Sequence, residues 1–359
     1  MKNRTAAIYC ILFVLILSLP LLLFGNQDAK SVVKENRTLN QSVSVPRSIA
    51  EINGDFTQQI ERYFSDHLGF RNTLVSLSNS VRVKILGANT VTSKVIEGSE
   101  GWLFYNPQGV DGDPLGDYLG THTYSQADLQ RISDYLVKVR DVCRAAGSEF
   151  YLILCPNKAS VYGDLYLPGY LGTGVEKGRA ELLYDYLREN TDIPCVYSED
   201  ELKSYRGTEY MYFKHDTHWT TLGAYLSYRQ WYYQYSGELL PPLEDCKKLI
   251  IEEHDDLSQQ LGITLPGDIY YRADFGRDIS YTEQCNEDGS CFTRITNRNG
   301  KKALMFRDSF LIYMQPYICQ DFEYTDIYVS QIGEEELALI QCEKPAVVIL
   351  EMVERYLPE

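Results

Sequence analysis

Two of the chain's five histidines share a short polar segment with an aspartate, and this segment is the first candidate for chemistry. The segment reads FKHDTHWTT and contains His215, Asp216 and His218. In an extended backbone, residues i and i+2 point to the same side, so the Asp216 carboxylate can hold one imidazole nitrogen of His218. A histidine oriented by a carboxylate is the general-base half of a catalytic triad.

The same segment allows two other interpretations. Imidazole and carboxylate groups are common metal ligands, so a metal site made of these three residues is one alternative. The other is a hydrogen-bonded loop before a helix, in which Thr220 or Thr221 caps the helix N-terminus. The spacing alone leaves the triad, the metal site and the structural loop open.

A serine later in the chain supplies a candidate nucleophile. The segment ALMFRDSF places Asp308 and Ser309 directly after a buried strand and before helix-like sequence. Sites in open α/β sheets form beyond the carboxyl ends of the strands. Backbone N–H groups at the start of the next helix can stabilise an oxyanion. We therefore expect Ser309 to be the nucleophile and Asp308 to be a turn or cap residue.

Five side chains near these segments are weaker candidates for substrate contact: Asn157, Lys158, Trp219, Arg307 and Tyr313. Asn157 and Lys158 follow a predicted strand, and a surface loop is the equal alternative for them. Arg307 precedes the Asp-Ser pair and either contacts a substrate carbonyl or anion or forms a salt bridge. Trp219 either stacks on a sugar ring or supports the loop.

The elements that must position these residues alternate between helix and strand after residue 124. Strands are predicted at 149–155, 194–198, 303–306, 325–330 and 346–353, and helices at 125–146, 177–190, 221–235 and 334–344. Strands that alternate with helices indicate a parallel sheet covered on both faces. The insertion at about 236–300 breaks this rhythm, and we expect irregular or antiparallel structure there. Glu354 and Arg355 follow the last strand, either as functional residues or as a structural ion pair.

The N-terminus differs from the rest of the chain. Lys2 and Arg4 precede residues 6–24, an uncharged apolar run about as long as a transmembrane helix. The positive flank stays on the cytoplasmic side, so the remainder is expected outside the cell membrane. We predict a single-pass anchor at 1–25, a stalk and membrane-proximal helical segment at 26–90, and a catalytic domain at 91–359. A cleaved signal peptide is the competing interpretation.

Charge and cysteine content exclude some classes of partner and site. The net charge is −16 and no basic patch is visible, which argues against nucleic acid as a partner. No C-x-x-C pair exists, so a structural zinc site is not expected. Cys285 and Cys291 flank a polar turn and are candidates for a disulfide. Cys143 and Cys155 lie in apolar segments and are expected to be core residues.

Taken together, these segments resemble one known family. The chain is similar to the SGNH-hydrolase-like proteins of the alginate acetylation family and to the related group with an Asp-His-His-Trp-type motif. The matching pieces are FSDHLGFRN, GSEGWLFY, CPNKASVY, KHDTHWTTLGAY, FRDSF and EMVERYLP, in the family's order. The resemblance implies an SGNH-like α/β fold, with a triad in which Asp216 and His218 precede Ser309.

The resemblance also implies a function. It predicts an exported O-acetyltransferase that acts on an exopolysaccharide through an acetyl-serine, with no cofactor and no metal. The implied partners are the polysaccharide acceptor, a membrane-bound O-acyltransferase that supplies acetyl groups, and a polysaccharide synthase complex. Two alternatives remain: an acetyl esterase with the same triad, and a noncatalytic scaffold of a polysaccharide export assembly.

Overall fold

A computed structural model defines the fold. It describes residues 94–107, 111–263, 265–274, 282–285, 291–295, 301–318, 320–329 and 331–358, and a few isolated positions before residue 64. The chain divides into two units, one of residues 93–255 with 266–359 and the other of residues 1–92 with 256–265. The second unit contains the helix α11 (Asp256–Leu261). The first is the α/β domain considered below.

The predicted N-terminal segments lie almost entirely outside the described residues. Of the apolar run at 6–24, only Tyr9, Phe13 and Ser18 are described, and each is helical. Within the described part of the chain, no helix has the length and apolar character needed to span a bilayer. The anchor at 1–25 and the stalk at 26–90 therefore stay predictions.

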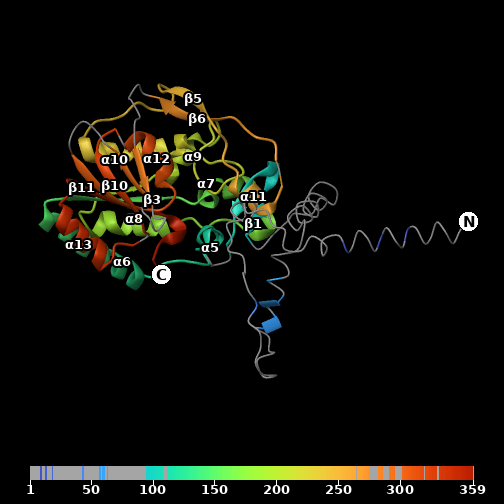
Figure 1. Ribbon diagram of the computed structural model, residues 1–359, viewed down its shortest axis with the longest axis horizontal. Helices are drawn as coiled ribbons and strands as arrows, with labels where there is room; N and C mark the ends of the chain where they lie inside the picture. The colour runs from blue at the N-terminus through green and yellow to red at the C-terminus, as the bar shows by residue number, and fades with distance from the viewer. Residues whose placement is uncertain are drawn as a thin grey trace, which may run out of the picture. The chain divides into compact units, whose positions relative to one another are not determined.

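The α/β domain is built on a seven-stranded sheet (Figure 1). Its strands, in spatial order, are β4 (Cys195–Tyr197), β3 (Glu149–Cys155), β11 (Val347–Val353), β9 (Lys302–Arg307), β10 (Glu323–Tyr328), β8 (Cys291–Ile295) and β7 (Thr282–Cys285). The first five are parallel. β8 and β7 extend the β10 edge in antiparallel pairing. The predicted parallel sheet is thus confirmed.

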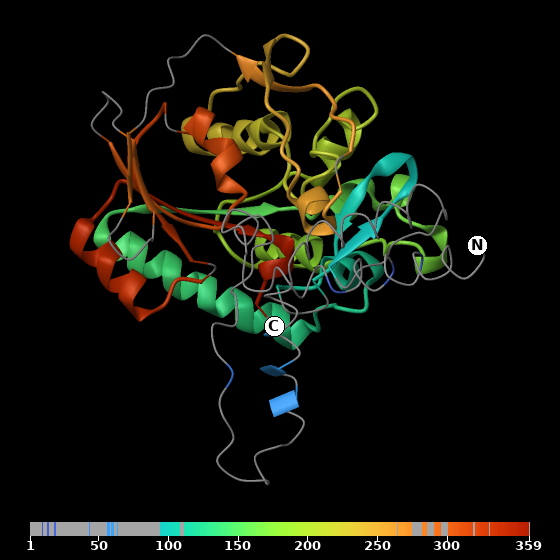
Figure 2. The same cartoon turned by 45° about the vertical axis from the view of Figure 1, so that its right-hand side comes forward.

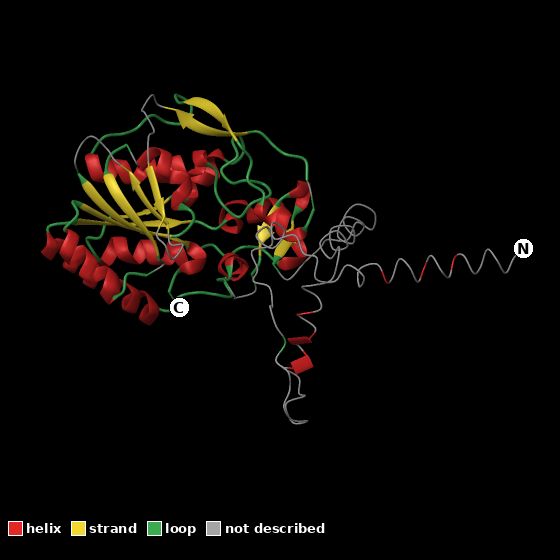
Figure 3. Cartoon of the chain, in the orientation of Figure 1, coloured by secondary structure: helices red, strands yellow, loops and turns green. Residues whose placement is uncertain are grey.

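Helices cover both faces of this sheet, as Figures 2 and 3 show. One face packs against α6 (Gln126–Ala146), α8 (Arg179–Asn190) and α13 (Glu334–Glu343), and the other against α10 (Thr221–Ser236) and α12 (Leu311–Ile318). Along β3, Leu152 and Leu154 point into the first core, whereas Ile153 and Cys155 point into the second. Burial on both faces explains why this strand is a continuous apolar run rather than an alternating one.

The long helix α6 begins and ends where the sequence predicts. The Ser125 hydroxyl accepts a hydrogen bond from the Asp128 amide, and the Asp128 carboxylate accepts one from the Ser125 amide. This capping box satisfies two N–H groups that the first helical turn leaves unpaired. Gly147 ends the helix in the left-handed conformation with φ of 83°, which glycine adopts without steric cost.

Within the described part of the α/β domain, the sequence missed three short helices: α5 (Pro114–Leu119), α7 (Lys158–Tyr166) and α9 (Glu199–Tyr205). In α7, the buried residues include Lys158, Ala159, Val161, Tyr162 and Gly163. Three of these are adjacent in sequence, so they do not form the single apolar stripe that identifies a helix. Tertiary packing, and not local periodicity, defines this element.

The remaining strands are antiparallel. β1 (Val95–Glu97) pairs with β2 (Leu103–Tyr105), and in the insertion β5 (Lys247–Ile251) pairs with β6 (Tyr270–Asp274). Antiparallel structure in the insertion is therefore confirmed. The β7–β8 register sets Cys285 opposite Cys291, and their disulfide stays a prediction. Cys143 and Cys155 are buried and free, as expected of core residues.

Candidate active site

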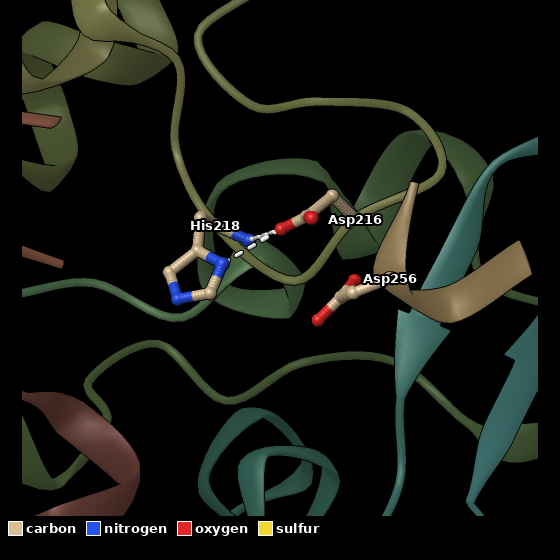
Figure 4. A group of neighbouring side chains, drawn as sticks. All are labelled: Asp216, His218 and Asp256. Carbon is tan, nitrogen blue, oxygen red and sulfur yellow. Dashed lines mark hydrogen bonds and ion pairs between the residues drawn. The ribbon is translucent and has the colours of Figure 1, made fainter. Parts of the chain in front are cut away.

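The loop before α10 presents the predicted base and its carboxylate. Tyr212 and Trp219 form an isolated antiparallel bridge that closes this loop. At its tip, the Asp216 Oδ1 atom accepts a hydrogen bond from the His218 backbone N–H at 2.8 Å. The same oxygen lies 2.7 Å from His218 Nδ1, so the carboxylate fixes this nitrogen as the protonated one (Figure 4). The loop backbone and the carboxylate together orient the imidazole.

Ser309 reaches the other side of the same imidazole. It lies in the turn at the carboxyl end of β9, and its Oγ is 2.6 Å from His218 Nε2. Since Nδ1 carries the proton, Nε2 accepts the hydrogen bond that the Ser309 hydroxyl donates. The three side chains therefore form one continuous hydrogen-bonded line, although 91 residues separate His218 from Ser309. Ser309 is partly exposed, so a substrate can approach its oxygen.

Asp308, the residue before Ser309, stabilises the turn. Asp308 Oδ1 accepts the Phe310 N–H at 2.8 Å, and Oδ2 accepts the Val353 N–H at 2.6 Å. The second bond connects this turn to the end of the neighbouring strand β11. The Asp308 N–H in turn donates to Glu351 at 3.0 Å. Asp308 is thus a turn residue, as expected.

Glu351 is fully buried beneath this turn in the middle of the sheet. Burial, and next the nearby Asp308 carboxylate, raise the pKa of Glu351 well above its usual range. The thiol of Cys155 also donates to Glu351, at 3.0 Å. A neutral carboxyl group here is consistent with the cost of burying two like charges side by side.

The backbone amides around Ser309 are not equivalent as oxyanion donors. The Phe310 amide already donates to Asp308, and the Tyr313 amide donates to the Phe310 carbonyl. Among the described residues, the Ser309 amide has no hydrogen-bond acceptor. The helix-start donors expected from the sequence are therefore partly engaged, and the Ser309 N–H is a candidate donor to an oxyanion.

Two aromatic residues predicted to contact substrate, Trp219 and Tyr313, lie near the candidate site. Trp219 is fully buried, and its Nε1–H donates to the Phe310 carbonyl at 2.9 Å. Its ring presents no surface to a sugar, and the loop-support interpretation fits this position. The Tyr313 ring centroid lies 5.2 Å from that of His218, so Tyr313 belongs to the wall around the base.

The polar residues Asn157, Lys158 and Arg307 are all buried, so the surface-loop alternative for the first two is wrong. Lys158 Nζ donates to the Leu103 carbonyl at 2.6 Å and to the Lys214 carbonyl at 3.2 Å, and thereby joins β2 to the base loop. Arg307 donates to the Asp308 carbonyl at 3.3 Å. Lys158 and Arg307 therefore stabilise the backbone around the site through hydrogen bonds to its carbonyl groups.

A second polar cluster, which the sequence did not reveal, lies behind Asn157. Arg179 Nε pairs with Asp117 Oδ1 at 2.6 Å, and Asn157 Nδ2 donates to Asp117 Oδ2 at 3.3 Å. Glu354 accepts the Asn157 N–H at 3.0 Å. Burial first, and then Asp117, raise the pKa of Glu354 to about 8. These residues carry no motif spacing, so no pattern in the sequence could have grouped them.

Glu354 and Arg355, adjacent in sequence, make separate contacts. The Ser160 hydroxyl donates to Glu354 at 2.5 Å, whereas the Arg355 guanidinium lies over aromatic rings. The ion pair considered for these two neighbours is absent from the interactions of the described residues.

The metal alternative does not fit the arrangement of the histidines. His215 Nδ1 lies 2.9 Å from Glu253 Oε1 and not beside Asp216. Burial lowers the pKa of His215 despite this carboxylate. Both ring nitrogens of His218 are engaged by Asp216 and Ser309. Within the described part of the chain, the group of possible metal ligands that includes Asp216 and His218 does not include His215.

Comparison with solved structures shows the same fold elsewhere. The structure of Bacillus cereus PatB1 with a sulfonyl adduct aligns with a TM-score of 0.50 at 15% identity, over 72% of this chain and 95% of that one. A DHHW family protein from Eubacterium siraeum gives a TM-score of 0.49 at 16% identity, over 74% and 96% of the chains. The O-acetyltransferase domain of Pseudomonas putida AlgJ gives 0.44 at 17% identity, over 74% and 92%.

One family model matches the first part of the domain. No curated protein matches the sequence. Residues 95–253, which include Asp216 and His218 but not Ser309, match the family model described as the SGNH hydrolase-like domain of the acetyltransferase AlgX. The resemblance predicted from the sequence is thereby confirmed: residues 95–253 are similar to the SGNH hydrolase-like domain of the AlgX acetyltransferase family.

Proposed function

We propose that this protein transfers acetyl groups to a hydroxyl of an extracellular polysaccharide through an acetyl-serine intermediate. The observation that carries the proposal is the hydrogen-bonded line Asp216–His218–Ser309 at the carboxyl edge of the parallel sheet. Part of this domain is similar to an acetyltransferase family. Such a line activates a serine that is otherwise a weak nucleophile.

In the first half of the reaction, Ser309 Oγ attacks the carbonyl carbon of an acetyl ester. Its proton passes to His218 Nε2, and the Asp216 carboxylate stabilises the imidazolium that forms. The oxyanion faces the Ser309 amide. Collapse breaks the ester bond, and the departing alcohol takes the proton from His218. The acetyl group is then bound to Ser309.

In the second half, the acceptor hydroxyl attacks acetyl-Ser309. His218 Nε2 accepts its proton, and collapse of the tetrahedral intermediate expels Ser309 Oγ, which recovers that proton. The products are the acetylated sugar and the free enzyme. Water in place of the sugar gives acetate, so transfer depends on a bound acceptor.

The setting of the reaction is part of the proposal. A single-pass anchor at 1–25 would hold the catalytic domain on the outer side of the cell membrane, as the apolar run at 6–24 supports. A membrane-bound O-acyltransferase would supply the acetyl groups and a polysaccharide synthase complex the acceptor. An acetyl esterase is the second candidate, because the same line of side chains hydrolyses an ester when water is the acceptor.

The test measures acylation directly. The protein is incubated with p-nitrophenyl acetate, and the modified peptide is located by mass spectrometry. We expect acetyl on Ser309 and none on the Ser309→Ala variant. A sulfonyl fluoride should block Ser309 in the same way, since PatB1 is known as a sulfonyl adduct. Acetylation of Ser309→Ala at the wild-type rate would overturn the proposal.

A further inference from the structure

We propose that Arg355 and Asn157 form a subsite that binds a hydroxyl of the acceptor, adjacent to the hydroxyl that is acetylated. This inference rests on the proposed function and adds the residues that recognise the acceptor. Both residues lie beside the line of Asp216, His218 and Ser309 without belonging to it.

Arg355 is a buried cation in an unusual setting. Its side chain is packed among three aromatic rings, with the guanidinium carbon 5.5 Å from the ring centre of Tyr105, 5.3 Å from Phe310 and 4.9 Å from Tyr356. Stacking on rings holds a guanidinium in place but leaves its in-plane N–H groups available. Arg355 has no ion pair with any carboxylate among the described residues, and its buried Nε has no hydrogen-bond partner there. Buried polar groups of this kind normally bind a partner.

Asn157 presents the complementary group. It is 1% exposed, and its Nδ2 donates to Asp117, which turns the Oδ1 atom away from that carboxylate. Oδ1 is buried and, like Arg355 Nε, has no partner among the described residues. The unused groups are therefore one donor and one acceptor.

The two residues line the same small cavity, together with Tyr105, Lys158 and Thr217 among others. Its volume is about 10 Å³, which is near the minimum for one water molecule. A carboxylate or phosphate is too large for this space, and the Asn157 oxygen would repel an anion. A hydroxyl fits both the size and the chemistry, because its oxygen accepts from Arg355 and its proton is donated to Asn157.

The position of the cavity links it to the reaction. Thr217 lies between Asp216 and His218 in the chain, and the Phe310 ring beneath Arg355 follows Ser309 directly. The cavity is thus lined in part by the loop that carries Asp216 and His218, and none of Asp216, His218 and Ser309 lines it. Sugars carry vicinal hydroxyls, so one hydroxyl can be bound here while its neighbour attacks acetyl-Ser309.

The experiment compares two small acceptors of equal size. The enzyme is acylated with p-nitrophenyl acetate in ethylene glycol or in 1-propanol, which have the same number of non-hydrogen atoms but two hydroxyls and one. The ratio of acetylated alcohol to acetate measures how acetyl-Ser309 partitions between transfer to the alcohol and hydrolysis by water. This ratio does not depend on the rate of acylation. We expect ethylene glycol to be preferred by about tenfold, the usual effect of one hydrogen bond to a charged donor.

Variants then assign the preference to the two residues. Arg355→Lys keeps the charge but removes Nε, and Asn157→Ala removes the acceptor. We expect each to lower the preference for ethylene glycol toward unity. Matched controls are Arg144→Lys and Asn190→Ala, which change the same residue types at exposed positions remote from the cavity. These controls should retain the wild-type preference.

The outcomes separate this inference from the proposed function. Transfer to both alcohols with equal efficiency, or a preference that survives in both Arg355→Lys and Asn157→Ala, would show that the cavity holds only a water molecule. That result overturns the subsite and leaves the transferase intact. Release of acetate alone in both alcohols contradicts the transferase itself, and the acceptor subsite with it.

Discussion

Two groups of polar side chains near the carboxyl edge of the sheet differ in exposure and in pairing. The reactive line is Asp216, His218 and Ser309. The buried cluster is the Arg179–Asp117 ion pair with the nearby Glu354 carboxyl group. In the reactive line, the His218 side chain is 15% exposed and Ser309 is partly exposed. In the buried cluster, each of the three residues is at most 4% exposed.

This difference separates chemistry from architecture. The reactive line ends in a neutral hydroxyl that solvent and substrate can reach, so this hydroxyl can take part in a reaction. The buried cluster pairs its charges internally, and such a pair contributes little net stability but is costly to break. Substitutions in the reactive line should therefore change the acylation rate, and substitutions in the buried cluster should change the free energy of unfolding.

The largest expected effect is on rate, in the reactive line. His218→Ala removes the base, and we expect the formation of acetyl-Ser309 to slow by about 10⁴-fold or more, because triad members act as a unit. Asp216→Ala should slow it by less, since it orients the base and leaves the imidazole in place. Stopped-flow measurement of p-nitrophenol release gives both values. A larger loss for Asp216→Ala than for His218→Ala would contradict these roles.

The next effect is on stability, in the buried cluster. Arg179→Met leaves the Asp117 carboxylate buried without its cation, and we expect a loss of about 3–5 kcal/mol in the free energy of unfolding. Urea denaturation measures this loss, and the acylation rate of the folded fraction should be unchanged. The double variant Asp117→Asn with Arg179→Met should recover part of the stability. An unaltered urea midpoint for Arg179→Met would show that the pair is not structural.

The pH dependence of stability should also report on the buried cluster. The pKa of Glu354 is raised from 4.5 to about 8, chiefly by burial, so the folded state binds a proton that the unfolded state has released. Stability from this group is complete below about pH 4.5 and is lost as the pH rises through 8. Glu354→Gln cannot ionise, so its melting temperature should fall less than that of the wild type between pH 6 and pH 9. Parallel melting curves would refute the raised pKa.

The smallest expected effect comes from Trp219, which packs beside the reactive line and stabilises it. Trp219→Phe removes the hydrogen bond from Nε1 to the Phe310 carbonyl, and we expect a loss of about 1 kcal/mol in stability and a severalfold lower acylation rate. Trp231→Phe is the matched control. Its buried Nε1 has no partner in the described part of the chain, so only ring size changes. Equal effects of the two substitutions would show that the Trp219 hydrogen bond does not position Ser309.

The sequence by itself determined the framework of the domain and the types of residue in the reactive line. Apolar runs such as Glu149–Cys155 and the Ser125 capping box are local signals, so strand β3 and helix α6 appear where they were predicted. The D-x-H spacing brings Asp216 and His218 together within one loop, which is again a local effect. The position of Ser309 after a strand indicated the edge at which it would lie.

Only the tertiary structure decided which polar residues share a site. Arg179, Asp117 and Glu354 come from three separate elements, and their proximity has no trace in local spacing. The short helix α7 is buried around most of its circumference, so no apolar stripe identified it. The cavity between Asn157 and Arg355 exists because β3 and β11 are neighbours, with Cys155 and Val353 paired at their ends. Side-chain burial and hydrogen bonding between distant segments depend on the packed chain, and periodicity along the sequence does not encode them.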